Sequence, residues 1–270
     1  MPVLKTHEIH LHYQRLEAQE PTDQPPLLML SGMASDSASW QPVIESLNQN
    51  LELILPDNRC TGQTLPNPVQ TDREKMVGDV LKLLDERQID RVNILGHSMG
   101  GMLGWALAAG APDRVNTLVA AAALPSVIPA RIALFKSLNA LRHKETEAQW
   151  FRLFYQFLFC ANFFNDELSV DTAVNASLNY PFKQNAESFA KQVAGLESFI
   201  ESPDLSAIEC NVTLITGSHD VLATPTMIEE FAADKTFVET NIINNAAHAL
   251  HWEQPKQFIS CVQSALGTHP

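Results

Sequence analysis

Cysteine is scarce in this chain, and the few cysteines stand far apart. Cys60, Cys160, Cys210 and Cys261 form no C-x-x-C pair and no cluster with histidine at the spacing of a zinc site. This pattern argues against a metal site and a dense disulfide framework, and it fits a reducing compartment. We therefore expect apolar burial, rather than metals or disulfides, to hold the fold together.

Basic residues are also few. Eighteen Lys and Arg stand against 31 Asp and Glu, which gives a formal net charge of −13. Phosphate backbones and anionic membrane surfaces repel such a chain, so we expect neither a nucleic-acid partner nor a membrane partner.

Long apolar runs are absent as well. The most apolar stretch, residues 118–124, ends at Pro125 and is far too short to span a bilayer. The first residues alternate polar and apolar side chains, unlike the apolar core of a secretory signal. These features favour a cytoplasmic protein.

Two kinds of segment do alternate along the chain. Short apolar runs that are typical of strands occupy residues 27–30, 51–55, 92–95 and 115–120, and helix-like amphipathic stretches separate them. This alternation predicts an α/β fold, with a mostly parallel central sheet covered by helices on both faces.

The alternation stops at Pro125 and resumes at Val212. Between these points the sequence shows only helical patterns. We therefore predict a sheet domain formed by residues 1–124 and 206–270, with a helical cap or lid inserted over residues 125–205.

Aromatic residues gather in one part of this insertion. Eight of the 20 aromatics in the chain fall within residues 150–164, and any helix drawn there would be apolar all round. Such a helix must be covered on both sides. Packing inside the insertion and the lining of a pocket are both compatible with this pattern, and Phe151, Phe154 and Phe157 are the candidate pocket residues.

One motif carries chemistry. Gly96-His97-Ser98-Met99-Gly100 is a G-x-S-x-G sequence that directly follows an apolar strand and directly precedes a helical pattern. A sharp strand-to-helix turn would hold the Ser98 hydroxyl at the sheet edge, and glycines two positions away avoid clashes with a Cβ. The free N–H groups of the following helix favour developing negative charge.

With this motif the sequence resembles the α/β-hydrolase family over essentially its whole length. That family orders its triad as nucleophile, acid and histidine. The matching positions are Ser98, then Asp220 after the strand-like run 212–216, then His248 ahead of a Glu and a Pro. The resemblance also covers residues 31–33, the family's oxyanion loop, and residues 57–64, which match its D-x-R-G-x-G-x-S loop.

Other residues compete for the acid and histidine roles. Asp204 and Asp234 lack the placement at a strand end, whereas His251, one helical turn beyond His248, is the rival histidine. His97 lies inside the turn and suits packing or a structural hydrogen bond, and His219 suits the surface.

Two positions depart from the family pattern. Ser31 replaces the usual histidine before Gly32, and Cys60 stands where the family has glycine. If the chain needs a positive φ at residue 60, the Cβ there would cost about 1 kcal/mol. Cys60 is expected to be buried and inert, and Arg59 to form a structural ion pair.

The resemblance implies acyl transfer to water. Ser98 would attack a carbonyl carbon, His248 would move the proton, Asp220 would orient the imidazole, and the Met33 and Met99 N–H groups would form the oxyanion hole. No cofactor and no metal are needed.

The aromatic stretch favours a small-molecule ester with an apolar acyl or aryl group. A carbon–carbon bond or enol-lactone hydrolase, a lyase or acyltransferase with the same triad, and a non-catalytic ligand-binding protein remain alternatives. The oligomeric state is not predicted.

Overall fold

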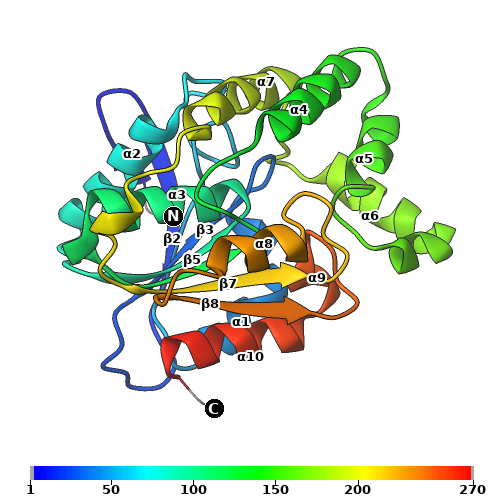
Figure 1. Cartoon of the computed structure of the whole chain (residues 1–270). Coiled ribbons are helices and arrows are strands. Elements are labelled where there is room, and N and C mark those ends of the chain that lie inside the picture. Colours follow the sequence, from blue (N-terminus) through cyan, green and yellow to red (C-terminus); the bar gives the residue numbers. More distant parts are fainter. Residues whose placement is uncertain (1–2, 269–270) are drawn as a thin grey trace.

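A computed structural model describes residues 3–268 and shows one eight-stranded sheet (Figure 1). Its strands, in spatial order, are β1 (Val3–Lys5), β2 (His10–Leu16), β4 (Leu53–Pro56), β3 (Leu27–Leu30), β5 (Val92–His97), β6 (Val115–Ala121), β7 (Asn211–Gly217) and β8 (Val238–Ile243). β1 and β2 pair antiparallel, β2 pairs antiparallel with β4, and the strands from β4 to β8 are parallel. The predicted fold class is confirmed.

Helices cover both faces of the sheet because its inner strands are apolar on both sides. Leu28 and Leu30 point into a core shared with α2 (Arg73–Glu86) and α3 (Met99–Gly110). Leu27 and Met29 point into a second core shared with α1 (Gln41–Leu47) and α10 (Pro255–Leu266). Each fully buried side chain of this size contributes about 1.5–3 kcal/mol.

Four longer helices lie between β6 and β7, in the 125–205 segment. They are α4 (Pro129–Arg142), α5 (Glu147–Tyr155), α6 (Glu167–Asn179) and α7 (Ala186–Gly195). Figure 1 shows α5 and α6 beyond the arrowheads of β7 and β8. The backbone N–H of Ala249 donates to Leu158 O (2.8 Å), which joins the segment to the loop after β8. After that loop come α9 (Leu250–Glu253) and α10, and α8 (Pro225–Ala232) follows β7.

The aromatic stretch 150–164 is not one helix. α5 ends at Tyr155, the chain turns, and a short 3₁₀ helix, η3, occupies Ala161–Asn165. The turn lets the rings pack on one another, with Phe159 stacked on Phe163 at 4.4 Å between ring centroids. The rings thus cover each other, and a continuous all-apolar helix is avoided.

Within residues 3–268, no helix has both the length and the apolar content needed to cross a membrane.

Candidate functional site

Ser98 occupies a strained turn between β5 and α3. Its backbone has φ 53° and ψ −120°, a conformation that non-glycine residues rarely adopt. A Cβ at Gly96 would overlap with the backbone of Gly100, and a Cβ at Gly100 would overlap with the carbonyl of Leu30. The two glycines therefore permit the close packing that holds Ser98 at the sheet edge.

The structure brings Ser98, Asp220 and His248 together from three separate loops. His248 Nδ1–H donates to Asp220 Oδ2 (2.9 Å), and Ser98 Oγ lies 2.9 Å from His248 Nε2. Because the carboxylate accepts the Nδ1 proton, a neutral His248 has Nε2 free to accept the Ser98 proton.

The backbone around Asp220 fixes its carboxylate. Oδ1 accepts from the N–H groups of Leu222 (2.7 Å) and Ala223 (3.0 Å), while Oδ2 faces His248. The Asp220 side chain is fully buried. A Cβ at Gly217 would overlap with the Ala246 and Ala247 carbonyls, so the loops after β7 and β8 pack in direct contact. This packing places the acid and the histidine side by side.

The remaining histidines differ in their surroundings. His97 Nε2–H donates to the backbone carbonyl of His248 (2.8 Å), and burial lowers the His97 pKa to about 3. His251 is also buried, which lowers its pKa well below the usual 6.5, and its ring lies 4.7 Å from that of His97. His219 is exposed. Among these histidines, His248 is the one hydrogen-bonded to Ser98 and Asp220.

The loop at residues 31–33 lies against the turn. A Cβ at Gly32 would be 3.1 Å from Ser98 Cβ, and both Met33 and Met99 line the cavity in which Ser98 lies. Ser31, which stands where the family pattern has histidine, donates its hydroxyl to Asp36 O (2.8 Å), and the Asn58 side chain donates to Ser31 O (2.9 Å). The loop is therefore supported despite the substitution.

The neighbouring loop has structural roles. Arg59 forms a two-point ion pair with Asp79 and a further bond to Glu8 (2.8 Å). Cys60 is buried at φ 68°, so the chain does require a positive φ where the family has glycine. The Cys60 Sγ–H donates to Val69 O (3.0 Å), and burial raises the pKa of the thiol. A thiol with a raised pKa is a poor nucleophile.

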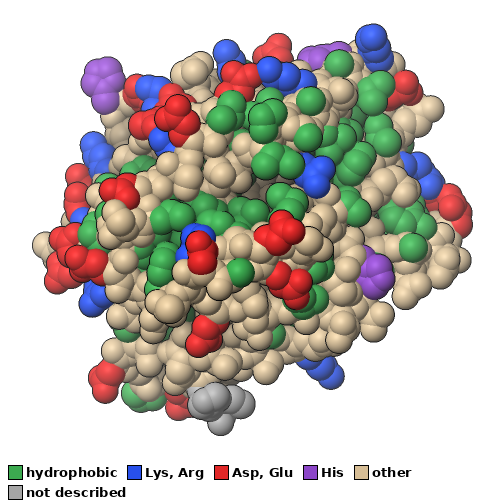
Figure 2. Space-filling model, viewed as in Figure 1, with side chains coloured by type: hydrophobic (Ala, Val, Ile, Leu, Met, Phe, Trp, Pro, Cys, Tyr) green, Lys and Arg blue, Asp and Glu red, His purple; other side chains and the backbone are tan. Residues whose placement is uncertain are grey.

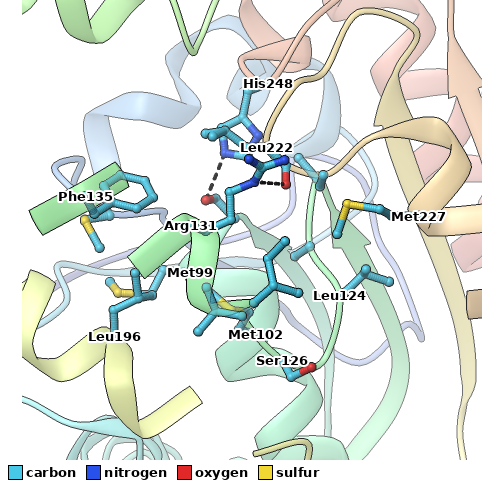
Figure 3. A pocket seen from close by; sticks show the side chains of 17 residues that line it. Met99, Met102, Leu124, Ser126, Arg131, Phe135, Leu196, Leu222, Met227 and His248 are labelled. Carbon is cyan, nitrogen blue, oxygen red and sulfur yellow. Dashed lines mark hydrogen bonds between the residues drawn. The ribbon is translucent and has the colours of Figure 1, made fainter. Parts of the chain in front are cut away.

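Two cavities meet at Ser98. The first, which we call the methionine cavity, has a volume of about 60 Å³ and is lined by four of the seven methionines, Met33, Met99, Met102 and Met227 (Figure 3). The second, the aromatic cavity, has about 310 Å³ and is lined by Phe151, Phe154, Tyr155 and Phe159. Both share Met33, Ser98, Phe135, Leu222 and His248.

Figure 2 shows apolar side chains gathered where α4 and α8 face each other, beside a hollow in the surface. Exposed Ile128 and Val221 belong to the loops at this place. The methionine cavity is lined by residues of the same loops, including Ile128 and Leu222.

Two of the three predicted pocket residues line a cavity. Phe151 and Phe154 do, whereas Phe157 packs against the main core and is not among the residues lining either cavity. Tyr155 and Phe159 line the aromatic cavity instead. The prediction of Phe157 assumed one continuous helix, and the turn after Tyr155 changes which rings face inward.

Sequence reasoning missed several residues at the site. Phe135 and Arg131 of α4, Met102 of α3 and Met227 of α8 all line the methionine cavity. Met102 lies one helical turn after Ser98, whereas Phe135, Arg131 and Met227 come near Ser98 through the packing of α4 and α8 and lie in no local motif. Within residues 3–268, no group of three or more His, Cys, Asp or Glu side chains is arranged to hold a metal.

Known proteins resemble this chain over most of its length. A family model described as alpha/beta hydrolase fold matches residues 25–255. Relatives from Stutzerimonas stutzeri and Rhizobium rhizogenes both carry the name "Putative carbamate hydrolase RutD". The first is 26% identical over 88% of this chain and 90% of its own length, and the second is 25% identical over 87% and 90%.

Solved structures share the fold. A hydrolase from Pseudomonas aeruginosa has a TM-score of 0.85 at 23% identity, over 99% of this chain and 98% of its own. The enol-lactonase from Burkholderia xenovorans has a TM-score of 0.85 at 21% identity, over 98% and 100%. A thermophilic esterase from Thermogutta terrifontis has a TM-score of 0.84 at 20% identity, over 99% and 98%.

Proposed function

Because the chain belongs to the alpha/beta hydrolase fold family, we propose that it is a serine hydrolase that cleaves a carboxylic ester through an acyl-enzyme on Ser98. The observation that carries this proposal is the continuous hydrogen-bonded path from Ser98 through His248 to Asp220, with 2.9 Å at each step. The path ends at a buried carboxylate whose other oxygen is already held by two backbone N–H groups.

The first half of the reaction forms the acyl-enzyme. Ser98 Oγ attacks the carbonyl carbon while His248 Nε2 takes the hydroxyl proton, and the negative charge of Asp220 stabilises the resulting imidazolium. The tetrahedral oxyanion accepts hydrogen bonds from the Met33 and Met99 N–H groups, each worth about 3 kcal/mol in comparable sites. The carbon–oxygen bond to the leaving group then breaks, and His248 returns the proton to the departing alkoxide.

The second half releases the acyl group. His248 takes a proton from water, the hydroxide attacks the acyl carbonyl, and the carbon–oxygen bond to Ser98 breaks as the proton returns to Oγ. These steps use the chain's own residues and water.

The two cavities support a two-sided substrate. An ester carbonyl bound at Ser98 has its acyl and alcohol portions on opposite sides, and the methionine and aromatic cavities both open at this serine. The p-nitrophenyl ring of a test ester suits the larger aromatic cavity. We also propose that the 125–205 segment acts as a lid, since α4 and α5 supply walls of these cavities, and that the enzyme works in the cytoplasm.

Replacing the nucleophile tests the proposal. Ser98→Ala should lower ester hydrolysis at least about 1000-fold, because no hydroxyl remains to be acylated. A fluorophosphonate probe should label the wild-type chain and leave the variant unlabelled. Thermal unfolding should show that the variant is folded, and substantial ester turnover by the folded variant would contradict the proposal.

Carbamate is a second candidate substrate class, because the named relatives are described as carbamate hydrolases. The enol-lactonase among the structural neighbours supports a third, the enol-lactones. Steady-state kcat/KM for p-nitrophenyl butyrate, a phenyl carbamate and an enol-lactone, measured with the same preparation, separates the three. The proposal expects the ester to be preferred, and a higher kcat/KM for either competitor would replace it.

A further inference from the structure

Arg131 is the one charged side chain that lines the methionine cavity beside the Ser98–His248 pair. It belongs to the first turn of α4, and Figure 3 shows it between Phe135 and Leu222, close to His248. Apart from Ser98, Ser126 and His248, the other lining residues are apolar. The half-buried Arg131 therefore supplies a positive charge on the wall of this cavity.

Two backbone carbonyls hold the guanidinium in place. Arg131 Nε–H donates to Leu222 O (3.0 Å), and one Nη2–H donates to Val221 O (2.5 Å). A guanidinium carries five N–H donors, so three remain without a protein acceptor within residues 3–268. The fixed fork of an arginine suits carboxylate oxygens at the free donors.

The charge of Arg131 has no acidic partner within residues 3–268, although the chain carries a net charge of −13. Five other arginines pair with carboxylates, as Arg59 does with Asp79 and Arg114 with Asp85, whereas Arg87, Arg91 and Arg142 have no ion pair within the described residues. Leu222 links Arg131 to Asp220, whose carboxylate oxygens already accept hydrogen bonds from His248, Leu222 and Ala223.

The position on α4 strengthens this positive potential. α4 begins at Pro129, and its N-cap residue Ile128 lines the same cavity. The N-terminus of a helix carries a partial positive charge that favours an anion. An uncompensated cation and a helix N-terminus therefore act on one small apolar cavity.

We propose that Arg131 binds a carboxylate carried by the acyl portion of the substrate, so that the preferred substrates are esters of short dicarboxylic acids. This inference rests on the proposed function and narrows its substrate class. The acyl portion is assigned to the methionine cavity because Arg131 lines it, and the aryl leaving group is assigned to the larger aromatic cavity. The net charge of the whole chain is −13, whereas the charged side chain on the wall of the methionine cavity is the cation Arg131.

Matched esters test the proposal. The p-nitrophenyl monoesters of succinate, glutarate and adipate are compared with neutral isosteres in which an isopropyl group replaces the carboxylate, namely the 4-methylpentanoate, 5-methylhexanoate and 6-methylheptanoate. Spontaneous hydrolysis is subtracted for each ester. At one chain length or more, wild-type kcat/KM should favour the anionic ester about tenfold or more, as expected for charge-assisted hydrogen bonds.

Variants assign this preference to Arg131. Arg131→Gln should lower the ratio of anionic to neutral kcat/KM by about tenfold, and Arg131→Lys should retain part of it. The matched control is Lys136→Gln, which removes one positive charge from the exposed face of the same helix, where Lys136 pairs with Glu197. This control should keep the wild-type ratio.

Several outcomes would overturn the proposal. Arg131 has no substrate role if the wild type shows no anionic preference at any length. The same conclusion follows if Arg131→Gln lowers kcat/KM equally for both members of each pair, because the residue would then only hold the loop after Asp220.

Binding provides a readout that does not need turnover. Ser98→Ala should bind monomethyl glutarate more tightly than methyl 5-methylhexanoate by calorimetry, and Ser98→Ala/Arg131→Gln should lose this difference. Equal affinities in the single variant would overturn the Arg131 proposal even if Ser98 is the nucleophile. A difference that depends on Arg131, without any ester turnover by the wild type, would instead overturn the proposed function alone.

Discussion

At the scale of single residues, His97 links the turn that carries Ser98 to the loop that carries His248. Burial keeps the His97 ring neutral, with a pKa of about 3, and its Nε2–H donates to the His248 carbonyl (2.8 Å). A neutral ring keeps a second positive charge away from the imidazolium that forms on His248 during catalysis. His97 is therefore a positioning residue, acting through His248.

Replacing His97 tests this role. His97→Leu removes the hydrogen bond at similar volume, and we expect kcat to fall about five- to tenfold, because one net hydrogen bond is lost. KM should change little, since His97 holds the backbone of His248 and substrate binding relies on other residues. His97→Gln keeps a donor and should recover part of kcat. An increase in KM at unchanged kcat would argue for a role in substrate binding instead.

The sequence allowed some of these residues to be predicted and not others. Ser98, Asp220 and His248 each lie in a local pattern at the end of a predicted strand, and the structure brings all three together. Arg131 contacts Leu222, 91 positions away, through the packing of α4, and no local pattern encodes that contact. The role of His97 likewise depends on His248, 151 positions away.

At the scale of elements, the turn between β5 and α3 depends on backbone approaching backbone. At Gly100, a Cβ would overlap with the carbonyl of Leu30 in β3, and no change of side-chain rotamer can relieve this overlap. Gly100→Ala should therefore lower the free energy of unfolding by about 3 kcal/mol or more, or prevent folding. Urea unfolding followed by circular dichroism measures this loss.

The matched control lies in α2. Gly78 is an exposed glycine inside that helix, and a Cβ there meets nothing within 4 Å. Gly78→Ala should raise the free energy of unfolding by about 0.5–1 kcal/mol, because alanine loses less backbone entropy in a helix. Wild-type stability in Gly100→Ala would mean that β3 can move away from the turn.

The inner strands of the sheet domain could be predicted because they are short apolar runs, and α2 because its apolar residues recur with one helical period. The structure of the stretch 150–164 could not be predicted, because its apolar residues would lie on all sides of a helix and therefore do not indicate which side faces the core. The structure resolves it by ending α5 at Tyr155 and stacking Phe159 on Phe163. Contacts between rings, rather than a period along the chain, decide which of them face the aromatic cavity.

At the scale of the whole molecule, several buried titratable groups give stability a defined dependence on pH. Burial lowers the pKa of His97 to about 3 and that of His251 well below 6.5. As the pH falls, these two histidines therefore bind protons in the unfolded chain before they do so in the folded chain. Their contribution to stability is present above pH 6.5 and is lost as pH falls toward the folded pKa values.

Asp36 works in the opposite direction. It is buried near Asp57, and these two causes raise its pKa from 3.8 to about 6. Between these two pH values the native state takes up the Asp36 proton and the unfolded chain does not, so this contribution grows as pH falls. Asp36 therefore offsets part of the acid destabilisation caused by the two histidines.

Removing the Asp36 carboxyl should expose the full effect of the histidines. Asp36→Asn keeps one oxygen that can accept from the Ala38 N–H, as Asp36 Oδ1 does now, and its NH2 group can donate to the Tyr180 hydroxyl oxygen, but it cannot ionise. Between pH 6 and pH 4, the free energy of unfolding should fall with decreasing pH more steeply than in the wild type, by about 1.4 kcal/mol per pH unit. Urea unfolding at steps of half a pH unit measures both slopes.

The matched control is Asp90→Asn, a substitution of an exposed residue, which should keep the wild-type slope. Parallel curves for Asp36→Asn and the wild type would show that Asp36 ionises equally in the folded and unfolded chains, which would contradict the offsetting role given to Asp36.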